Sequence, residues 1–398
     1  MEHALADRAR RAGGLDVGTT VQLLRRASYL ERSAIRAIAG WFLRVPAYEA
    51  KIALGYVLWS HAERVDGMRA RLHELRGGHR DASIEPALQL VGEELLHAPD
   101  EASFLRGVRW LLTSLDDAYA TYLHLADPAA NAMEVRLIAR MRGDLVRDQA
   151  RLNEWTDASD DPWVAYLASL LTAAGGVGGL EARQPPLPRP HAGHFVRPTR
   201  NCFDARLRTG DLLSYDQKLS MPLEERRIAE FQVFFNEFYA AALLASVLYD
   251  AWTTQAPWEF FLDVAHHFWD EVRHAEFGLR RLRELGVEPT VVNQTLFEHA
   301  QGMPFLHRFC YLTLGLEVFF MPRKKPRYRY YQDAGDARSQ LFADFDWSDE
   351  QNHVRYGTRW VNYFLEDDAR TVADLQAEIA AYLQEVQANL PQGQLAPF

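Results

Sequence analysis

Two long apolar stretches of this chain each carry a single charged residue, a glutamate, near the middle. Residues 231–249 (FQVFFNEFYAAALLASVLY) contain only Glu237 as a charge, and residues 309–322 (FCYLTLGLEVFFMP) contain only Glu317. Burying an unpartnered carboxylate costs several kcal/mol. The chain must therefore fold so that each glutamate meets a counter-charge, loses its own charge or binds a cation.

A Glu-x-x-His sequence follows each of these glutamates at almost the same interval, 271 − 237 = 34 residues in one case and 350 − 317 = 33 in the other. In Glu-x-x-His the two side chains lie one helical turn apart on one face, so both can reach the same ion. The interval suits two antiparallel helices joined by a short turn. The six candidate ligands are Glu237, Glu271, His274, Glu317, Glu350 and His353.

These six residues predict a site for two metal ions. Their four carboxylates balance the charge of two divalent ions, which makes burial of the carboxylates tolerable. Oxygen-rich ligation with one imidazole for each metal suits iron or manganese, whereas a closed zinc site favours cysteine and histidine. We therefore expect two iron ions, with a manganese–iron pair as the alternative.

The two motifs also match beyond the ligands, and each reads Asp-Glu-x-x-His-x-x-x-Gly, at 270–278 and at 349–357. Asp270 and Asp349 lie four residues before the histidines and share their helix face, so we expect each to hold an imidazole N–H. Gly278 and Gly357 lie one turn beyond the histidines, where a glycine lets a neighbouring helix approach closely.

Residues 222–360 resemble the ferritin-like superfamily of non-haem di-iron proteins. The motifs at 270–274 and 349–353 are most similar to those of its oxygen-activating members. The resemblance implies that the six candidate ligands bind iron and that Asp270 and Asp349 support them by hydrogen bonding. It also implies a four-helix bundle around the metals.

Helical periodicity dominates the chain and no segment alternates convincingly with period 2, so the expected fold class is all-α. The expected helices are 18–42, 46–76, 101–125, 130–154, 162–174, 222–253, 257–285, 290–320, 335–343, 348–364 and 370–389. Glycine and proline between 175 and 200 mark a domain boundary. We expect two ferritin-like four-helix bundles: an N-terminal, metal-free one at 1–175, a linker and junction at 176–221, and the di-iron bundle at 222–398.

Acidic residues in the first half recur at intervals like those of the second, 63 − 31 = 32 residues and 148 − 117 = 31. The residues concerned are Glu31, Glu63, Asp117 and Asp148. Three residues after the second member of each pair come Asp66 and Arg151 rather than histidines. Two interpretations stay open: a distant duplication that lost its metal ligands, or ordinary helix-surface charges with a chance spacing.

An oxygen-activating di-iron centre implies an enzyme, and we expect an O2-dependent oxygenase or oxidase acting on a small organic substrate. The chain contains no flavin or iron–sulfur motif, so an external reductase or ferredoxin would supply electrons. A pocket beside the metals would be shaped by Phe234, Phe235, Leu316, Phe319 and Phe320. The alternatives are a ferroxidase or iron-handling protein, and a non-catalytic ferritin-like scaffold.

Bulk composition bears on partners and location. The net charge of −10 argues against nucleic acid as an obligate partner, and two cysteines in 398 residues favour a reducing, cytoplasmic location. Glu237 at the centre of 231–249 indicates a buried bundle helix rather than a membrane span.

The basic cluster Arg323-Lys-Lys-Pro-Arg-Tyr-Arg at 323–329 is expected to be a solvated loop, with contact to an anionic substrate, a carrier protein or RNA as the alternative.

Overall fold

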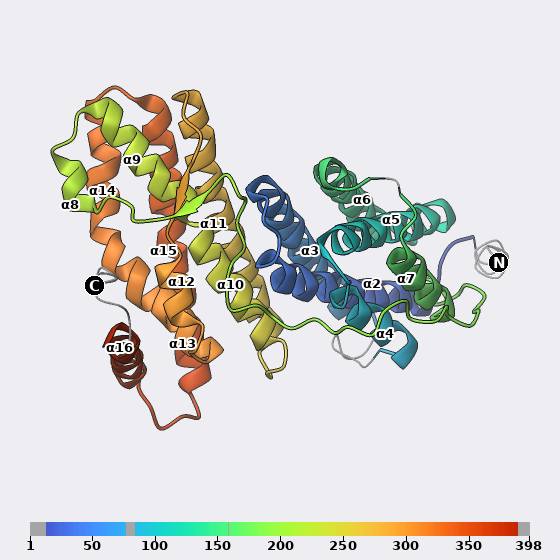
Figure 1. Ribbon diagram of the computed structural model, residues 1–398. Coiled ribbons are helices and arrows are strands. Elements are labelled where there is room, and N and C mark those ends of the chain that lie inside the picture. The colour runs from blue at the N-terminus through green and yellow to red at the C-terminus, as the bar shows by residue number, and fades with distance from the viewer. Residues whose placement is uncertain (1–12, 77–83, 158, 389–398) are drawn as a thin grey trace. The chain divides into compact units, whose positions relative to one another are not determined.

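The computed structural model describes residues 13–76, 84–157 and 159–388, and its architecture is predominantly helical (Figure 1). The all-α fold class expected from periodicity is confirmed. Strand structure in the described part of the chain is confined to one short parallel pair, β1 (Arg208–Thr209) with β2 (Val291–Val292).

The chain forms two compact units. The first unit comprises Met1–Trp41 and Tyr56–Arg197, and the second unit comprises Phe42–Gly55 and Pro198–Phe398. The chain passes from the first unit to the second between Arg197 and Pro198. This point lies within the segment 176–221, where the glycine- and proline-rich composition predicted the domain boundary. The segment Phe42–Gly55, however, was expected in the N-terminal domain and belongs to the second unit.

Packing explains why Phe42–Gly55 belongs to the second unit. The Phe42 ring meets Phe268 edge-on at 4.9 Å between centroids, and Nζ of Lys51 donates a hydrogen bond of 2.7 Å to Oδ1 of Asn201. A Cβ atom on Gly55 would collide with the side chain of Val272. Periodicity shows that this segment has an apolar face, but it does not show which core covers that face.

The helices of the first unit follow the expected pattern closely. Five of them begin and end within two residues of the expected bounds, whereas α4, which starts with a proline in its first turn, was not expected. In chain order they are α2 (Val17–Phe42), α3 (Tyr48–Glu74), α4 (Pro86–Leu96), α5 (Glu101–Leu125), α6 (Ala132–Leu152), the 3-10 turn η1 (Asn153–Trp155) and α7 (Pro162–Ala173).

The glycine-rich residues after α7 form a fixed turn. Gly175, Gly176 and Gly179 have φ values of 82°, 72° and 74°, which only glycine adopts readily. The guanidinium of Arg26 on α2 donates three hydrogen bonds of 2.6–2.9 Å to backbone carbonyls in and beside this turn, those of Ala174, Gly176 and Val177. This stretch is irregular in backbone shape but is tied to the first unit.

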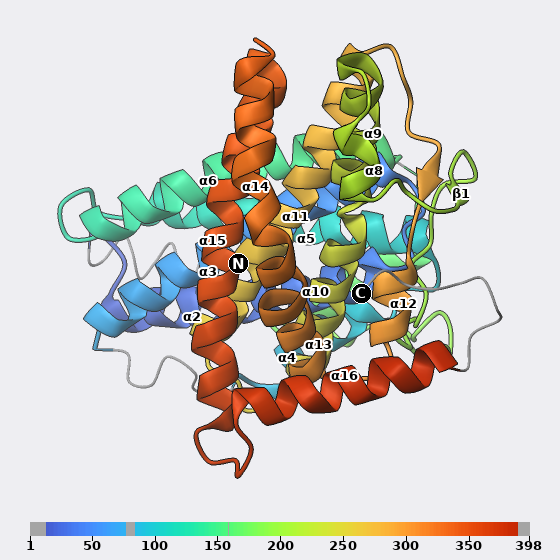
Figure 2. The same ribbon diagram turned by 90° about the vertical axis from the view of Figure 1, so that its left-hand side faces the viewer.

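In the second unit the two longest helices, α11 and α15, run alongside one another and shorter helices pack around them (Figure 1). Figure 2 shows α14 and α15 side by side, with α16 crossing near one end of α15. In chain order the helices are α8 (Tyr215–Leu219), α9 (Leu223–Asn236), α10 (Phe238–Ala251), α11 (Trp258–Glu284), α12 (Thr295–Ala300), α13 (Phe305–Cys310), the π-helical turn η2 (Tyr311–Leu316), α14 (Glu317–Asp333), α15 (Ala337–Leu365) and α16 (Val372–Ala388).

Four expected helices of the second unit are organised differently. The helix expected at 222–253 is interrupted at Glu237, and 290–320 is divided into a strand, two short helices and a π-helical turn. The helices expected at 335–343 and 348–364 are one continuous helix, α15.

The basic residues 323–329 are not a loop, contrary to expectation. They lie within α14, which continues through Pro322 and Pro326 to Asp333. Proline removes a helical hydrogen bond, so this helix needs other stabilisation. Two of its cations, Lys324 and Arg327, are buried and form ion pairs with carboxylates on α15 and α9.

The apolar stretch Leu223–Ala251 is long enough to cross a membrane and has an 18-residue window with a mean hydropathy of 1.4. Within that window, 78% is buried inside the protein. This burial is what a core helix shows, which agrees with the interpretation drawn from Glu237 at its centre.

Candidate metal centre

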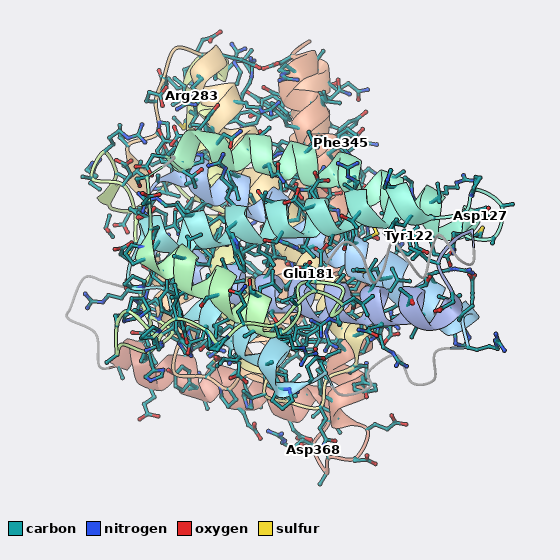
Figure 3. The ribbon with its side chains drawn as sticks, turned by 90° about the vertical axis from the view of Figure 1, so that its right-hand side faces the viewer. Tyr122, Asp127, Glu181, Arg283, Phe345 and Asp368 are labelled. Carbon is teal, nitrogen blue, oxygen red and sulfur yellow. The ribbon has the colours of Figure 1, made fainter. Side chains whose placement is uncertain are left out.

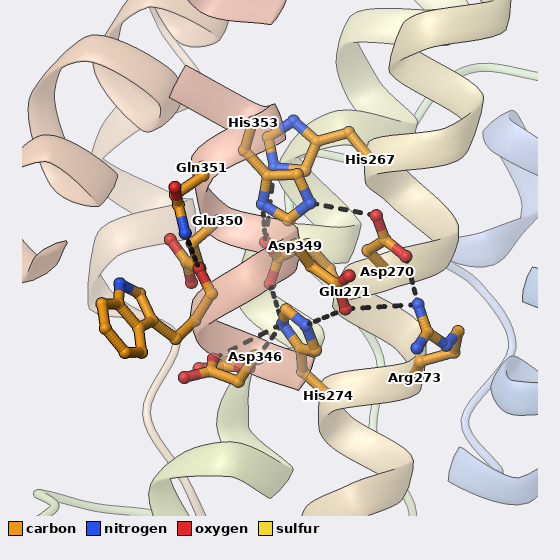
Figure 4. A network of polar contacts seen from close by, with 12 residues as sticks. His267, Asp270, Glu271, Arg273, His274, Asp346, Asp349, Glu350, Gln351 and His353 are labelled. Carbon is orange, nitrogen blue, oxygen red and sulfur yellow. Dashed lines mark hydrogen bonds and ion pairs between the residues drawn. The ribbon is translucent and has the colours of Figure 1, made fainter. Parts of the chain in front are cut away.

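Eight side chains of types that can ligate a metal come together between the helices of the second unit, and Figure 4 labels six of them. They include all six residues that the sequence indicated, together with His267 and Asp346, which it did not. They are Glu237 between α9 and α10, His267, Glu271 and His274 on α11, Glu317 at the start of α14, and Asp346, Glu350 and His353 on α15.

Four of the eight form one group, here called cluster A: His267, Glu271, Glu317 and His353. All four are buried, and one ligand atom from each lies within 4.8 Å of the others. Nε2 of His267 is 2.7 Å from Oε1 of Glu317, and Nδ1 of His353 is 3.3 Å from Oε1 of Glu271. Cluster A thus offers two imidazoles and two carboxylates to one ion.

The other four form cluster B: Glu237, His274, Asp346 and Glu350. Nδ1 of His274 lies 3.2 Å from Oε2 of Glu237 and 3.8 Å from Oδ1 of Asp346. The same nitrogen is 3.8 Å from Oε2 of Glu271, whose other oxygen faces cluster A. Glu271 therefore presents one oxygen to each cluster, as a carboxylate that bridges two metals would.

Several of these ligand atoms are buried without a hydrogen bond. Among the described residues, no hydrogen-bond partner meets either oxygen of Glu317, or Nδ1 of His274 or His353. The same holds for Oε2 of Glu237 and Oε2 of Glu350. Buried polar atoms are normally satisfied, because leaving one unpaired is costly. Convergent, unpaired donor atoms of this kind fit a bound cation.

The aspartates before the ligand glutamates hold the histidines, and they do so across the helix pair. Nε2 of His274 on α11 lies 3.2 Å from Oδ2 of Asp349 on α15, and Nε2 of His353 on α15 lies 3.2 Å from Oδ2 of Asp270 on α11. The guanidinium of Arg273 contacts both aspartates. Each imidazole is thereby fixed with Nδ1 towards the ligand clusters.

Irregular backbone precedes or surrounds both isolated glutamates. Glu237 separates α9 from α10 with φ −64° and ψ −3°, and Glu317 directly follows the π-helical turn η2. A π-helical turn changes which face the following residues present, and such turns are frequent at functional sites. Regular helices at these points would give the two side chains other directions.

The glycines of the repeated motif allow the close helix approach that was expected. A Cβ atom on Gly278 would overlap the backbone of Phe231 and Phe235 on α9. A Cβ atom on Gly357 would overlap the side chain of Thr313 in η2. Each glycine lets the segment next to an isolated glutamate lie directly against a helix that carries Glu-x-x-His.

The electrostatics of the centre are those of crowded, buried carboxylates. Burial, opposed by the Lys324 ammonium and reinforced by Glu317, raises the pKa of Glu350 to about 8. Burial also raises the pKa of Glu237. Although burial acts in the opposite direction, hydrogen bonds and nearby carboxylates raise the pKa values of His274 and His353 well above the ordinary range. A metal ion that binds here must displace protons from these groups.

Lys324 supplies a cation that the sequence interpretation placed in solvent. Its Nζ donates hydrogen bonds of 2.7 Å to Oδ1 of Asp346 and 2.6 Å to Oε1 of Glu350. Arg327, one turn further along α14, lies 3.5 Å from Oδ2 of Asp346. Cluster B therefore shares two of its carboxylates with a buried ammonium group.

The two ligand candidates that sequence reasoning missed carried a signal. His267, Glu271 and His274 occupy positions i, i+4 and i+7 of α11, and Asp346, Glu350 and His353 occupy the same positions of α15. These spacings place three ligand-type side chains on one helix face. A search one turn before each Glu-x-x-His would have found both residues.

The five residues expected to shape a pocket do not form one lining. Phe234, Phe235 and Leu316 are buried in the core, whereas the side chain of Phe319 is 51% exposed and lies beside Phe320 under the guanidinium of Arg323. A cavity of about 620 Å³ lies in the first unit. Tyr122 and Glu181, both labelled in Figure 3, contribute to its wall.

The first unit contains a buried polar cluster of its own. Glu31 and Asp148, two of the four acidic residues with the repeated spacing, both contact Arg64: its Nε lies 2.9 Å from Glu31 and its Nη1 lies 2.7 Å from Asp148. His61 Nδ1 also contacts Glu31. Glu63 and Asp117, the other two acidic residues, are exposed on the surface.

Comparison with known proteins adds one match. No curated protein and no solved structure is similar enough to this chain to match it. A family model covers the part of the chain that holds clusters A and B together with Lys324, Asp270 and Asp349. Residues 215–398 match this family, which is described as "Protein of unknown function (DUF455)".

Proposed function

We propose that the second unit is a ferritin-like four-helix bundle that holds two iron ions in clusters A and B and oxidises a small organic substrate with O2. The four helical elements are α9 with α10, α11, the run from α13 to α14, and α15. The observation that carries the proposal is the convergence of buried ligand atoms that lack hydrogen bonds, in two adjacent groups, with Glu271 of cluster A also facing His274 of cluster B.

The donor sets fit iron. Cluster A combines two imidazoles with two carboxylates, and cluster B combines one imidazole with three carboxylates. Such oxygen-rich sets with imidazole suit iron or manganese rather than structural zinc. The two described cysteines, Cys202 and Cys310, belong to neither cluster.

Bound iron would supply the electrons and Lewis acidity that activation of O2 requires. The protein's own part is to hold the ligands in place and to keep water out. Asp270 and Asp349 orient the imidazoles, and Glu271 spans the two clusters. The buried rings of Phe234 and Phe235 belong to the apolar core of the same unit. An external reductase or ferredoxin would return the electrons after each turnover.

The proposal is tested by loading the full chain with Fe(II) without oxygen and recording the optical spectrum as O2 is admitted. We expect a visible absorption change in the wild type that is lost in His274→Ala and kept in His307→Ala, a control histidine of the same unit that pairs with Glu378 and belongs to neither cluster. An O2 response that ends after about one O2 per pair of irons, and resumes with a reductant, supports the oxygenase.

Two other outcomes would contradict the oxygenase. Continued oxidation of many irons per chain, with ferric iron accumulating, would indicate a ferroxidase. Tight iron binding with no response to O2 would indicate a scaffold in which the metals are structural.

A further inference from the structure

The ammonium group of Lys324 contacts cluster B, and its ion pairs in the described part of the chain include no member of cluster A. It follows Glu317 by seven residues, close to two helical turns, so both side chains project from the same face of α14. The Lys324 side chain is 4% exposed, and its ammonium group bonds to Asp346 and Glu350, both members of cluster B. The ammonium is thus a fixed part of cluster B.

Cluster A is surrounded differently. In the part of the chain that the structure describes, the ion pairs of Glu271 and Glu317 are with the histidines His267, His274 and His353. A histidine can bind a metal through its neutral imidazole, whereas an ammonium group cannot serve as a ligand. The groups around cluster A therefore become ligands when an ion binds.

The ammonium of Lys324 is also held firmly. Arg327 lies beyond Asp346 and also contacts Glu230 on α9, with 3.1 Å between Nε of Arg327 and Oε2 of Glu230. A second cation on this side hinders movement of the Lys324 ammonium away from cluster B. A divalent ion bound by Asp346 and Glu350 must therefore share these carboxylates with a positive charge, and like charges repel strongly where little water screens them.

We propose that Lys324 makes the two metal positions unequal, so that cluster A fills first and cluster B fills only at a higher metal concentration. This inference rests on the proposed function, since it assumes that both clusters bind metal. It adds that occupancy of the second position is set by a residue of this chain that is not itself a ligand. At limiting metal the protein would hold one ion, in cluster A.

The test is a titration of the full chain with Co(II) without oxygen, followed by calorimetry and by metal analysis after desalting. We expect the wild type to bind in two steps whose dissociation constants differ at least about tenfold, which corresponds to about 1.4 kcal/mol. Lys324→Met removes the competing charge, so its second step should tighten by about tenfold or more while the first changes little. Lys325→Met, the same change at the exposed neighbouring position, should behave as the wild type.

Two single-ligand variants keep the inference testable even if Lys324→Met does not fold. His353→Gln in cluster A should abolish the tight step, and His274→Gln in cluster B should abolish the weak step. Circular dichroism establishes that each variant is folded.

The outcomes separate this inference from the proposed function. Two equal steps in the wild type, an unchanged second step in Lys324→Met, or loss of the weak step in His353→Gln would overturn the role of Lys324 while leaving a dimetal centre intact. Failure of the wild type to bind Co(II) at all would overturn both.

Discussion

Both units bury carboxylates between their helices, but they neutralise them by different means. In the first unit a single guanidinium, that of Arg64, bonds to both Glu31 and Asp148. In the second unit five carboxylates from the two clusters meet the ammonium of Lys324, the guanidinium of Arg327 and three histidines. The first cluster contains its own counter-charge, whereas the carboxylates of the second outnumber its two fixed cations, Lys324 and Arg327, which fits divalent ions.

The comparison bears on whether the two halves are copies of one another. Glu31 and Asp148 are buried in the core, whereas Glu63 and Asp117, their partners in the repeated spacing, are exposed. His61 and Arg64 on α3 are three residues apart, as Glu271 and His274 are on α11. The first unit therefore buries one carboxylate from each spaced pair and does not reproduce the paired glutamates of the second unit.

The largest expected effect comes from removing the counter-charge of the first unit. Arg64→Met leaves Glu31 and Asp148 buried without their shared cation, and breaking a buried ion pair in this way costs about 3–5 kcal/mol. Urea unfolding should show this loss, while Co(II) binding by the second unit stays unchanged. Arg140→Met, an exposed position on α6, is the control. A loss no larger than that of the control would show that Arg64 does not stabilise the first unit.

A somewhat smaller effect is expected from metal itself. An ion present at about 100 times its dissociation constant stabilises the folded second unit by about 2.7 kcal/mol, whereas the first unit has no such dependence. Hydrogen exchange should show increased protection in α11 and α15 on addition of Co(II), reversed by a chelator, with α2 and α3 residues of the first unit unaffected. Equal protection of both units would remove the contrast between them.

The aspartates that hold the imidazoles should matter less than the ligands themselves. Asp270→Asn weakens the hydrogen bond that orients His353, and changes of this kind reduce metal affinity by about 10–100-fold. Calorimetry with Co(II) measures the change, and Asp344→Asn at an exposed position of α15 is the matched control. An affinity equal to that of the control would mean that His353 is oriented by packing alone.

The smallest expected effect is a change in how the stability of the first unit declines at acid pH. Although burial acts in the opposite direction, Arg64 and His61 hold the pKa of Glu31 below its ordinary value of 4.5. Because the folded-state pKa lies below the unfolded one, the stability that Glu31 contributes is present above pH 4.5 and is lost as the pH falls below it. Glu31→Gln should therefore flatten the decline of stability in acid, and Glu63→Gln, an exposed neighbour, should not. An unchanged slope in Glu31→Gln would contradict this account.

Much of the candidate site could be predicted from the sequence because helical spacing alone determines which side chains share a face. Glu237 and Glu317 stood out as lone charges in apolar segments. A Glu-x-x-His motif follows each of them after 34 or 33 residues, which suits two antiparallel helices. The positions of Asp270 and Asp349 beside an imidazole followed from the same geometry. The structure adds that each holds the histidine of the opposite helix, which spacing within one helix cannot show.

The rest depended on contacts between segments far apart in the chain. A solvated loop was expected at 323–329 after a helix at 290–320, yet α14 continues through Pro322 and Pro326, and its Lys324 and Arg327 form buried ion pairs with other helices. A basic cluster looks the same in sequence whether its charges face solvent or a carboxylate core. The membership of Phe42–Gly55 in the second unit was hidden for the same reason, since it is decided by packing against Phe268 and Val272.

The most direct test of the contrast between the units is the number of metal ions that each protein retains, measured by native mass spectrometry after anaerobic Fe(II) loading and desalting. The same substitution is available in both buried clusters, His353→Gln in the second unit and His61→Gln in the first. We predict about two ions per chain in the wild type and in His61→Gln, and at most about one in His353→Gln. A wild-type chain without iron, or a chain that loses iron through His61→Gln and keeps it in His353→Gln, would contradict the account.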